Sequence, residues 1–111
     1  MSHVRFPGEK IFGTIVMNYY TGMSNDENKA YISGEVSNPN YFKGSIDMTT
    51  MYYDSSYNMV GQCANIIKLL GKGYSVISFS CHIEENEMMN NKKFNDIAFY
   101  KIRISDLVID N

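Results

Sequence analysis

Apolar and polar residues alternate along two stretches of the chain with the period of a β-strand. Residues 29–37 and 76–84 each place small or large apolar side chains at every second position. Because successive side chains of a strand point to opposite faces, this alternation predicts two half-buried strands. The apolar positions are Ala30, Ile32 and Val36 in the first stretch and Ile77, Phe79, Cys81 and Ile83 in the second.

Two further stretches are also typical of strands. Residues 11–20 form an apolar, β-prone run that is expected to end at Thr21-Gly22, before a polar turn over 23–28. Asn38-Pro39-Asn40 then ends the strand over 29–37, so the first two strands predict a hairpin. After a polar loop over 85–93, residues 94–109 alternate again as one long strand or two, with a bulge at Asp106.

A different period runs through residues 54–70. Apolar residues recur there at intervals of three and four, which predicts one stripe of an amphipathic helix. Asp54 is suited to the N-cap, and Gly71 to the left-handed position that follows a helix. Residues 46–53 stay ambiguous between an extended lead-in and an earlier helical turn capped by Asp47. The stripe consists of Met59, Cys63, Ile66, Ile67 and Leu70.

The order of these elements is strand, strand, helix, strand and long strand. With 111 residues the chain is expected to be one domain, 1–111, with a single core. The elements predict the α+β class, as an antiparallel sheet wrapped around one central helix. The pattern does not choose among the folds of that architecture.

Composition and charge limit the kinds of partner and the cellular compartment that we expect for the chain. The formal charge is −2 and the ten Lys and Arg residues are dispersed, which argues against nucleic acid. The apolar runs are too short to cross a bilayer, so no membrane role is expected. The N-terminal residues lack the pattern of a secretory signal, and Cys63 and Cys81 are interpreted as two reduced core thiols. The chain is therefore expected to be cytoplasmic.

Candidate chemistry concentrates in residues 38–58, where several tyrosines surround a carboxylate. Hydroxyls such as that of Tyr41 could polarise a carbonyl group, and Asp54 could orient a water molecule. The alternative is structural: tyrosines bury their rings and keep their hydroxyls wet, and Asp54 is a cap. The two histidines and the absence of a Cys-x-x-Cys spacing predict no metal site, and no pattern calls for a cofactor.

Two segments resemble a known family. The runs GTIVMNYYTGMSNDENKAYISGEVSNPNYF and SIDMTTMYYDSSYNMVGQCANI are similar to the N-terminal half of the FcoT-like hot-dog thioesterases, over about residues 9–66. The resemblance implies a hot-dog fold, a homodimer with acyl tunnels near the subunit interface, and hydrolysis of long-chain acyl-CoA. The ligand would be an acyl thioester or another small apolar molecule.

The resemblance also implies site residues. The family's loop tyrosine falls on Tyr41, its helix-start asparagine on Asp54, and its pre-helix asparagine on Ser45. These three are the catalytic candidates, with Tyr53 and Tyr57 as substrate-binding candidates. Asp54 and Ser45 depart from the family's amides, and an ionised carboxylate cannot donate the hydrogen bond that an amide donates.

A second hypothesis needs no catalysis. Nine tyrosines and eight methionines are many for a chain of this size, and both residue types are common at interfaces between proteins. A non-enzymatic binding or inhibitor protein, such as an immunity protein or a phage anti-defence factor, would use them to cover a protein partner. This hypothesis predicts an exposed apolar patch without an enclosed tunnel.

Overall fold

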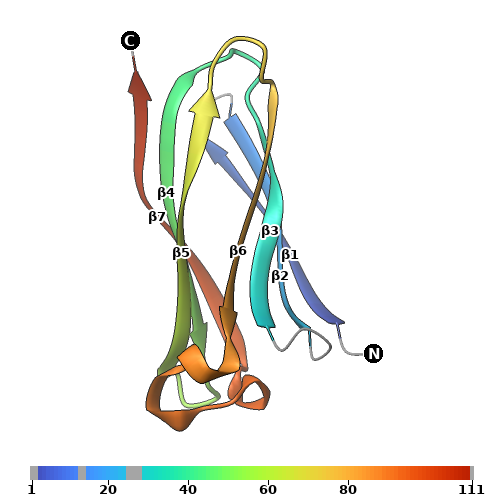
Figure 1. The fold of residues 1–111 in the computed structure, drawn as a ribbon, viewed down its shortest axis with the longest axis vertical. Helices are drawn as coiled ribbons and strands as arrows, with labels where there is room; N and C mark the ends of the chain where they lie inside the picture. The colour runs from blue at the N-terminus through green and yellow to red at the C-terminus, as the bar shows by residue number, and fades with distance from the viewer. Residues whose placement is uncertain (1–2, 13–14, 25–28, 111) are drawn as a thin grey trace.

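The chain folds into two antiparallel β-sheets. The computed structural model describes residues 3–12, 15–24 and 29–110. These residues form a four-stranded sheet in the order β1-β2-β3-β6 and a three-stranded sheet in the order β5-β4-β7 (Figure 1). The strands are β1 (His3–Phe12), β2 (Ile15–Ser24), β3 (Lys29–Ser37), β4 (Lys43–Tyr53), β5 (Met59–Leu70), β6 (Val76–Glu84) and β7 (Phe99–Asp110).

Along the chain, the β4–β5 pair of one sheet lies between β3 and β6, which pair with each other in the other sheet. The chain leaves the first sheet after β3, forms the β4–β5 pair in the second sheet, and returns so that β6 pairs with β3. It then crosses once more, and β7 pairs with the other edge of β4. This alternation between sheets is the arrangement of Greek-key sandwiches.

The core lies between the sheets. Side chains at alternate positions of β3 and β6 point toward those of β4 and β5, so each strand contributes one face. Burial of this apolar surface is the main stabilising contribution to such a domain. The most buried apolar residues include Met17, Ile32, Val36, Ile46, Met48, Tyr52, Val60 and Leu69.

The helix expected over 54–70 is wrong. Asp54 and the residues up to Asn58 form a turn, and the rest of the segment is β5. Two residues of the expected apolar stripe, Ile66 and Leu70, are 64% and 49% exposed on the outer face. Ile67, which belonged to that stripe, and Leu69, which did not, are both buried, with the period of two that a strand requires.

Apolar residues in this segment are dense enough to satisfy both periods. A register shift between Tyr52 and Tyr53 also interrupts the period of two in β5, because Val60 and Gly61 are adjacent and both buried. Pairing along the whole of β4 decides the outcome. Gly71 does take a left-handed conformation (φ 84°), but in the turn between β5 and β6, where its carbonyl accepts a hydrogen bond from the Tyr74 amide.

The strands over 29–37 and 76–84 are confirmed as β3 and β6. Residues 46–53 are extended, as part of β4, so Asp47 is not a helix cap. The bulge expected at Asp106 is present, because Asp47 faces Asp106 and Met48 faces Ile104, which leaves Ser105 extra. The run over 11–20 contains the end of β1 and the start of β2, and most of the turn over 23–28 lies outside the described residues.

The α+β, hot-dog architecture is therefore wrong as well. The helical segments among the described residues are three 3-10 turns of three residues each, and none lies inside a sheet. They are η1 (Glu85–Glu87), η2 (Met89–Asn91) and η3 (Phe94–Asp96). No helix in the described part of the chain is long and apolar enough to cross a membrane.

A disulfide joins the two sheets. Cys63 of β5 and Cys81 of β6, which were expected to be reduced thiols, are bonded to each other, with their Cα atoms 6.2 Å apart. β5 and β6 are edge strands of different sheets, so hydrogen bonds of a ladder do not hold them together. The disulfide closes that side of the sandwich covalently.

We expect loss of this disulfide to lower the free energy of unfolding substantially. The cysteines are 18 residues apart, and a loop of about this length corresponds to roughly 3 kcal/mol in the chain-entropy description. Urea unfolding of the Cys63→Ala/Cys81→Ala variant should show this loss. A reductant should destabilise the wild type equally and leave the variant unchanged, and equal stability of oxidised and reduced wild type would contradict the expectation.

Candidate functional site

Three aromatic side chains form an exposed cluster at one end of the second sheet, here called the aromatic platform: Tyr53, Tyr57 and Phe99. Tyr53 ends β4 and faces Phe99, the first residue of β7, across the ladder. Tyr57 comes from the β4–β5 turn and stacks on Phe99, with ring centroids 4.9 Å apart and planes within 3° of parallel. Tyr57 is 72% exposed and Phe99 is 44% exposed.

Asp54 organises the turn that carries Tyr57. Its Oδ1 accepts hydrogen bonds from the amides of Ser56 and Asn58, both at 2.9 Å. Its Oδ2 accepts a longer bond from the Asn58 side chain and lies 3.7 Å from Lys92 Nζ. Tyr57 itself has φ 63°, a left-handed conformation that costs a bulky residue free energy and that the surrounding hydrogen bonds must hold.

The electrostatics of Asp54 follow from these bonds. The hydrogen bond from the Asn58 amide lowers the pKa of the Asp54 carboxyl, burial opposes it, and the Ser56 amide, the Asn58 side chain and Lys92 lower it further. A carboxylate with a lowered pKa is a weaker base, and these donors already occupy its oxygens. Asp54 acts as a structural acceptor in a tight turn.

A shallow hollow of about 420 Å³ lies beside the platform. Tyr100 and Lys101 line it together with the three aromatic residues, so one ammonium group lies next to an apolar surface. Lys101 is exposed on the outer face of β7. The site therefore offers stacked rings, the hydroxyls of three tyrosines and one cation.

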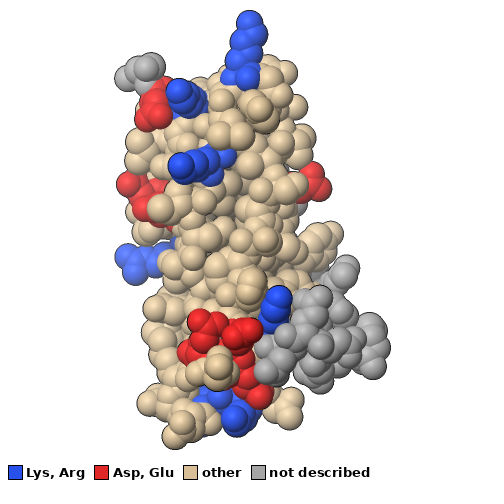
Figure 2. Space-filling model, viewed as in Figure 1, with Lys and Arg blue, Asp and Glu red and all other residues tan. Residues whose placement is uncertain are grey.

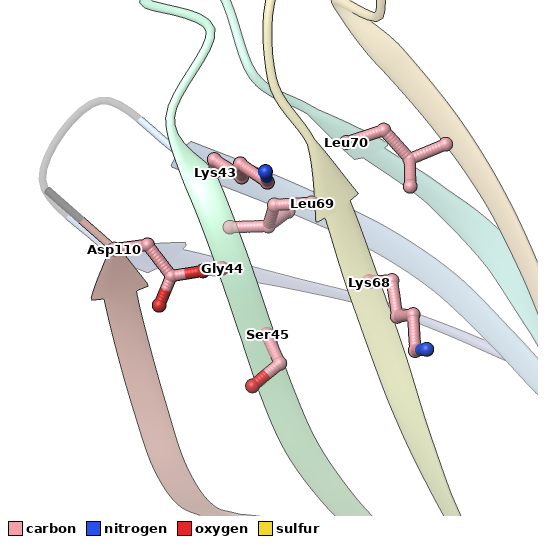
Figure 3. A pocket seen from close by; sticks show the side chains of 7 residues that line it. All are labelled: Lys43, Gly44, Ser45, Lys68, Leu69, Leu70 and Asp110. Carbon is pink, nitrogen blue, oxygen red and sulfur yellow. The ribbon is translucent and has the colours of Figure 1, made fainter.

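The other two catalytic candidates lie at the opposite end of β4. Tyr41 is in the loop that precedes this strand, is 46% exposed and has φ 54°. Ser45, the third residue of the strand, lines a hollow of about 290 Å³ with Lys43, Lys68 and Asp110 (Figure 3). β4 has eleven residues, which corresponds to about 33 Å between its ends. The structure thus groups Tyr53, Asp54 and Tyr57 and does not bring Tyr41 or Ser45 to them.

The acidic side chains after β6 also have structural partners. Acidic residues gather over the 3-10 turns at one end of the face in Figure 2. Glu85 accepts a hydrogen bond from the Phe94 amide and Glu87 accepts one from the Glu84 amide. His82 is exposed near the end of β6, and the described residues contain no group of three or more His, Cys, Asp or Glu that could hold a metal ion.

Phe99 is the platform residue that the sequence analysis missed. Its signal was present, because the alternation over 94–109 placed Phe99 on the face opposite Tyr100 and Ile102. An aromatic residue on the polar face of a strand is a candidate for binding, since burial in the core does not explain it.

We expect Asp54 to contribute to the acid dependence of stability. Because the pKa of Asp54 is lower in the folded state, ionised Asp54 stabilises the fold at pH values above the ordinary pKa of a carboxyl group. This contribution is lost as the pH falls and the carboxyl becomes protonated, between about pH 5 and pH 2. Thermal unfolding of Asp54→Asn should therefore show a smaller loss of stability between these pH values than the wild type shows. Asp110→Asn, which changes an exposed carboxylate at the other end of the sheet, is the control, and an unchanged acid limb in Asp54→Asn would contradict the expectation.

Comparisons with known proteins add no family to this description. No protein-family model matches the chain, and neither does any curated protein or solved structure. The similarity to the FcoT-like thioesterases over residues 9–66 stays a prediction. Function is therefore argued from the arrangement of the chain's own residues.

Proposed function

We propose that the protein is a non-enzymatic binding domain that recognises a partner protein through the aromatic platform. The observation that carries the proposal is the stacked, solvent-exposed pair of Tyr57 and Phe99. Aromatic residues dominate the binding energy of many protein interfaces, because each ring buries a large area with few rotatable bonds. A folded domain gains nothing for its own core from rings left in water.

The platform is also held in place before any partner binds. Tyr57 is carried by a turn that four hydrogen bonds close: two accepted by Asp54 Oδ1, and two between backbone groups of Asp54, Tyr57 and Asn58. Tyr53 and Phe99 are on paired strands. Because little conformational freedom remains to be lost on binding, more of the contact energy becomes affinity.

Lys101 indicates the chemistry of the partner. It lines the hollow beside the rings, so a partner that inserts an apolar side chain and carries a carboxylate next to it would satisfy both features. The partner surface that complements this site is an apolar side chain with a few acidic residues around it. Among the described residues, the hollows are open to solvent, which suits contact with a protein better than enclosure of a lipid chain.

Hydrolysis of an acyl thioester stays a prediction and ranks below binding. It requires a group that polarises the carbonyl close to a group that activates water. Tyr41 and Asp54 lie at opposite ends of β4, and Asp54 is engaged in its turn. Purified protein that releases free thiol from acyl-CoA, with the activity lost in Tyr41→Phe, would support hydrolysis against binding.

As a second part of this proposal, the disulfide supports a location outside the reducing cytosol. Cytoplasmic residence was expected partly because both cysteines were interpreted as reduced. Cys63 and Cys81 are bonded, and bridges between strands persist mainly in oxidising environments. In this proposal the platform meets secreted or surface-exposed partners.

Selection of peptides from a phage-displayed random library on the wild-type domain tests the platform. We expect enriched peptides to combine aromatic or aliphatic anchors with an acidic residue. Their affinity should fall roughly 10- to 100-fold for Tyr57→Ser and for Phe99→Ser, the range found for aromatic anchors.

The matched control is Tyr74→Ser. Tyr74 is 52% exposed in the turn between β5 and β6, at the opposite end of the sandwich. The Tyr74→Ser variant should therefore bind the peptides with the affinity of the wild type. Circular dichroism should show all three variants folded, because the altered side chains are exposed. Peptides that bind both platform variants as well as the wild type would reject the proposal.

A further inference from the structure

β7 is a long strand with one unpaired edge. It has twelve residues, pairs with β4 on one side, and is the last strand in the order of its sheet. In Figure 1 its C-terminal half lies beside β4 at the left of the view, and no described strand pairs with its far edge. An edge of this length presents a row of free N–H and C=O groups that can pair with another strand.

The sequence of β7 is complementary to itself when read in the opposite direction. Antiparallel pairing of two copies about a two-fold axis between Ile104 and Ser105 places Phe99 opposite Asp110 and uses all twelve residues of both strands. The bulge at Ser105 makes this possible. It reverses which positions face outward in the second half of the strand, so outward residues meet outward residues on both sides of the central Ile104–Ser105 pairs.

Opposite charges meet on the outer face in this register. Arg103 lies opposite Asp106 of the second copy, and symmetry repeats the pair. Lys101 lies opposite Val108 and diagonal to both Asp106 and Asp110. The first half of the strand carries the cations and the second half the carboxylates, and all of these charged residues are exposed in the single chain.

Apolar residues meet on the inner face. Tyr100 lies opposite Ile109 of the second copy, and Ile102 lies opposite Leu107. Tyr100, Ile102 and Leu107 are only partly buried in the single chain, and Ile109 is 37% exposed. A second strand beside them would remove further apolar surface from water.

Asp106 gives a separate reason for a cation at this edge. Within the chain it faces Asp47 of β4, and like charges directly opposite each other destabilise a sheet. Arg103 of a second copy would lie on the other side of Asp106 and offset this repulsion.

We infer that the protein forms a homodimer through antiparallel β7–β7 pairing, which joins the three-stranded sheets of two copies into one continuous sheet. This dimer differs from a hot-dog dimer. Its pairing includes Phe99 of the aromatic platform, opposite Asp110 of the second copy, but leaves Tyr57, which is in the β4–β5 turn, outside the paired strands. It places the two platforms at opposite ends of the shared sheet face, so the dimer would present two binding sites.

Exchange of the charges tests the pairing. Arg103→Asp leaves only carboxylates at the pair, and Asp106→Arg leaves only guanidinium groups, so each variant should weaken the dimer roughly 10- to 100-fold in sedimentation equilibrium. Mixing the two variants restores both ion pairs, and we expect a heterodimer of near wild-type affinity. The variant with both substitutions should also regain dimerisation.

Glu35→Lys is the matched control, because it reverses an exposed charge on β3, in the other sheet, and should leave the dimer unchanged. Thermal unfolding of each variant shows that it is folded. A wild type that stays monomeric up to about 1 mM, or a mixture of Arg103→Asp and Asp106→Arg that forms no heterodimer, overturns the inference.

Discussion

The position of β4 between β5 and β7 is the constraint on which the rest of the structure depends. Its inner side chains, Ile46, Met48 and Tyr52, are almost completely buried against the other sheet, and both of its edges are paired. β5 and β7 have no other strand partner among the described residues. The hairpin turn, the start of β7 and the aromatic platform therefore all depend on the ladders of this one strand.

The same strand explains why the candidate residues separate into two groups. Residues 38–58 are close in sequence, and a helix starting at Asp54 would have allowed them to converge. Because residues 43–53 are extended, Tyr41 and Ser45 lie near one end of the sandwich, and Asp54 and Tyr57 lie near the other. A strand keeps the ends of a short segment apart, whereas a turn of helix brings them together.

Closure of the sandwich is uneven. On one side the Cys63–Cys81 disulfide joins the edge strands β5 and β6. On the other side, no strand of the described residues pairs with the far edge of β7, and the inner residues beside it are only partly buried. Natural proteins protect such edges with bulges and charges, and β7 has both. Its bulge and charges also match a second copy of the same strand, so the features that discourage random association are compatible with one specific pairing.

The sequence by itself determined the strands whose two faces differ in polarity. β3, β6 and β7 follow from the period of two, and the bulge near Asp106 follows from the break in that period. The sequence also grouped Tyr53, Asp54 and Tyr57, which lie together in the structure at one end of β4. Only the tertiary structure decided the conformation of residues 59–70, because their apolar residues satisfy both a helix and a strand, and pairing with β4 favours the strand. It also decided which cysteines meet and that Phe99 joins Tyr57, since both depend on contacts between segments far apart in the chain.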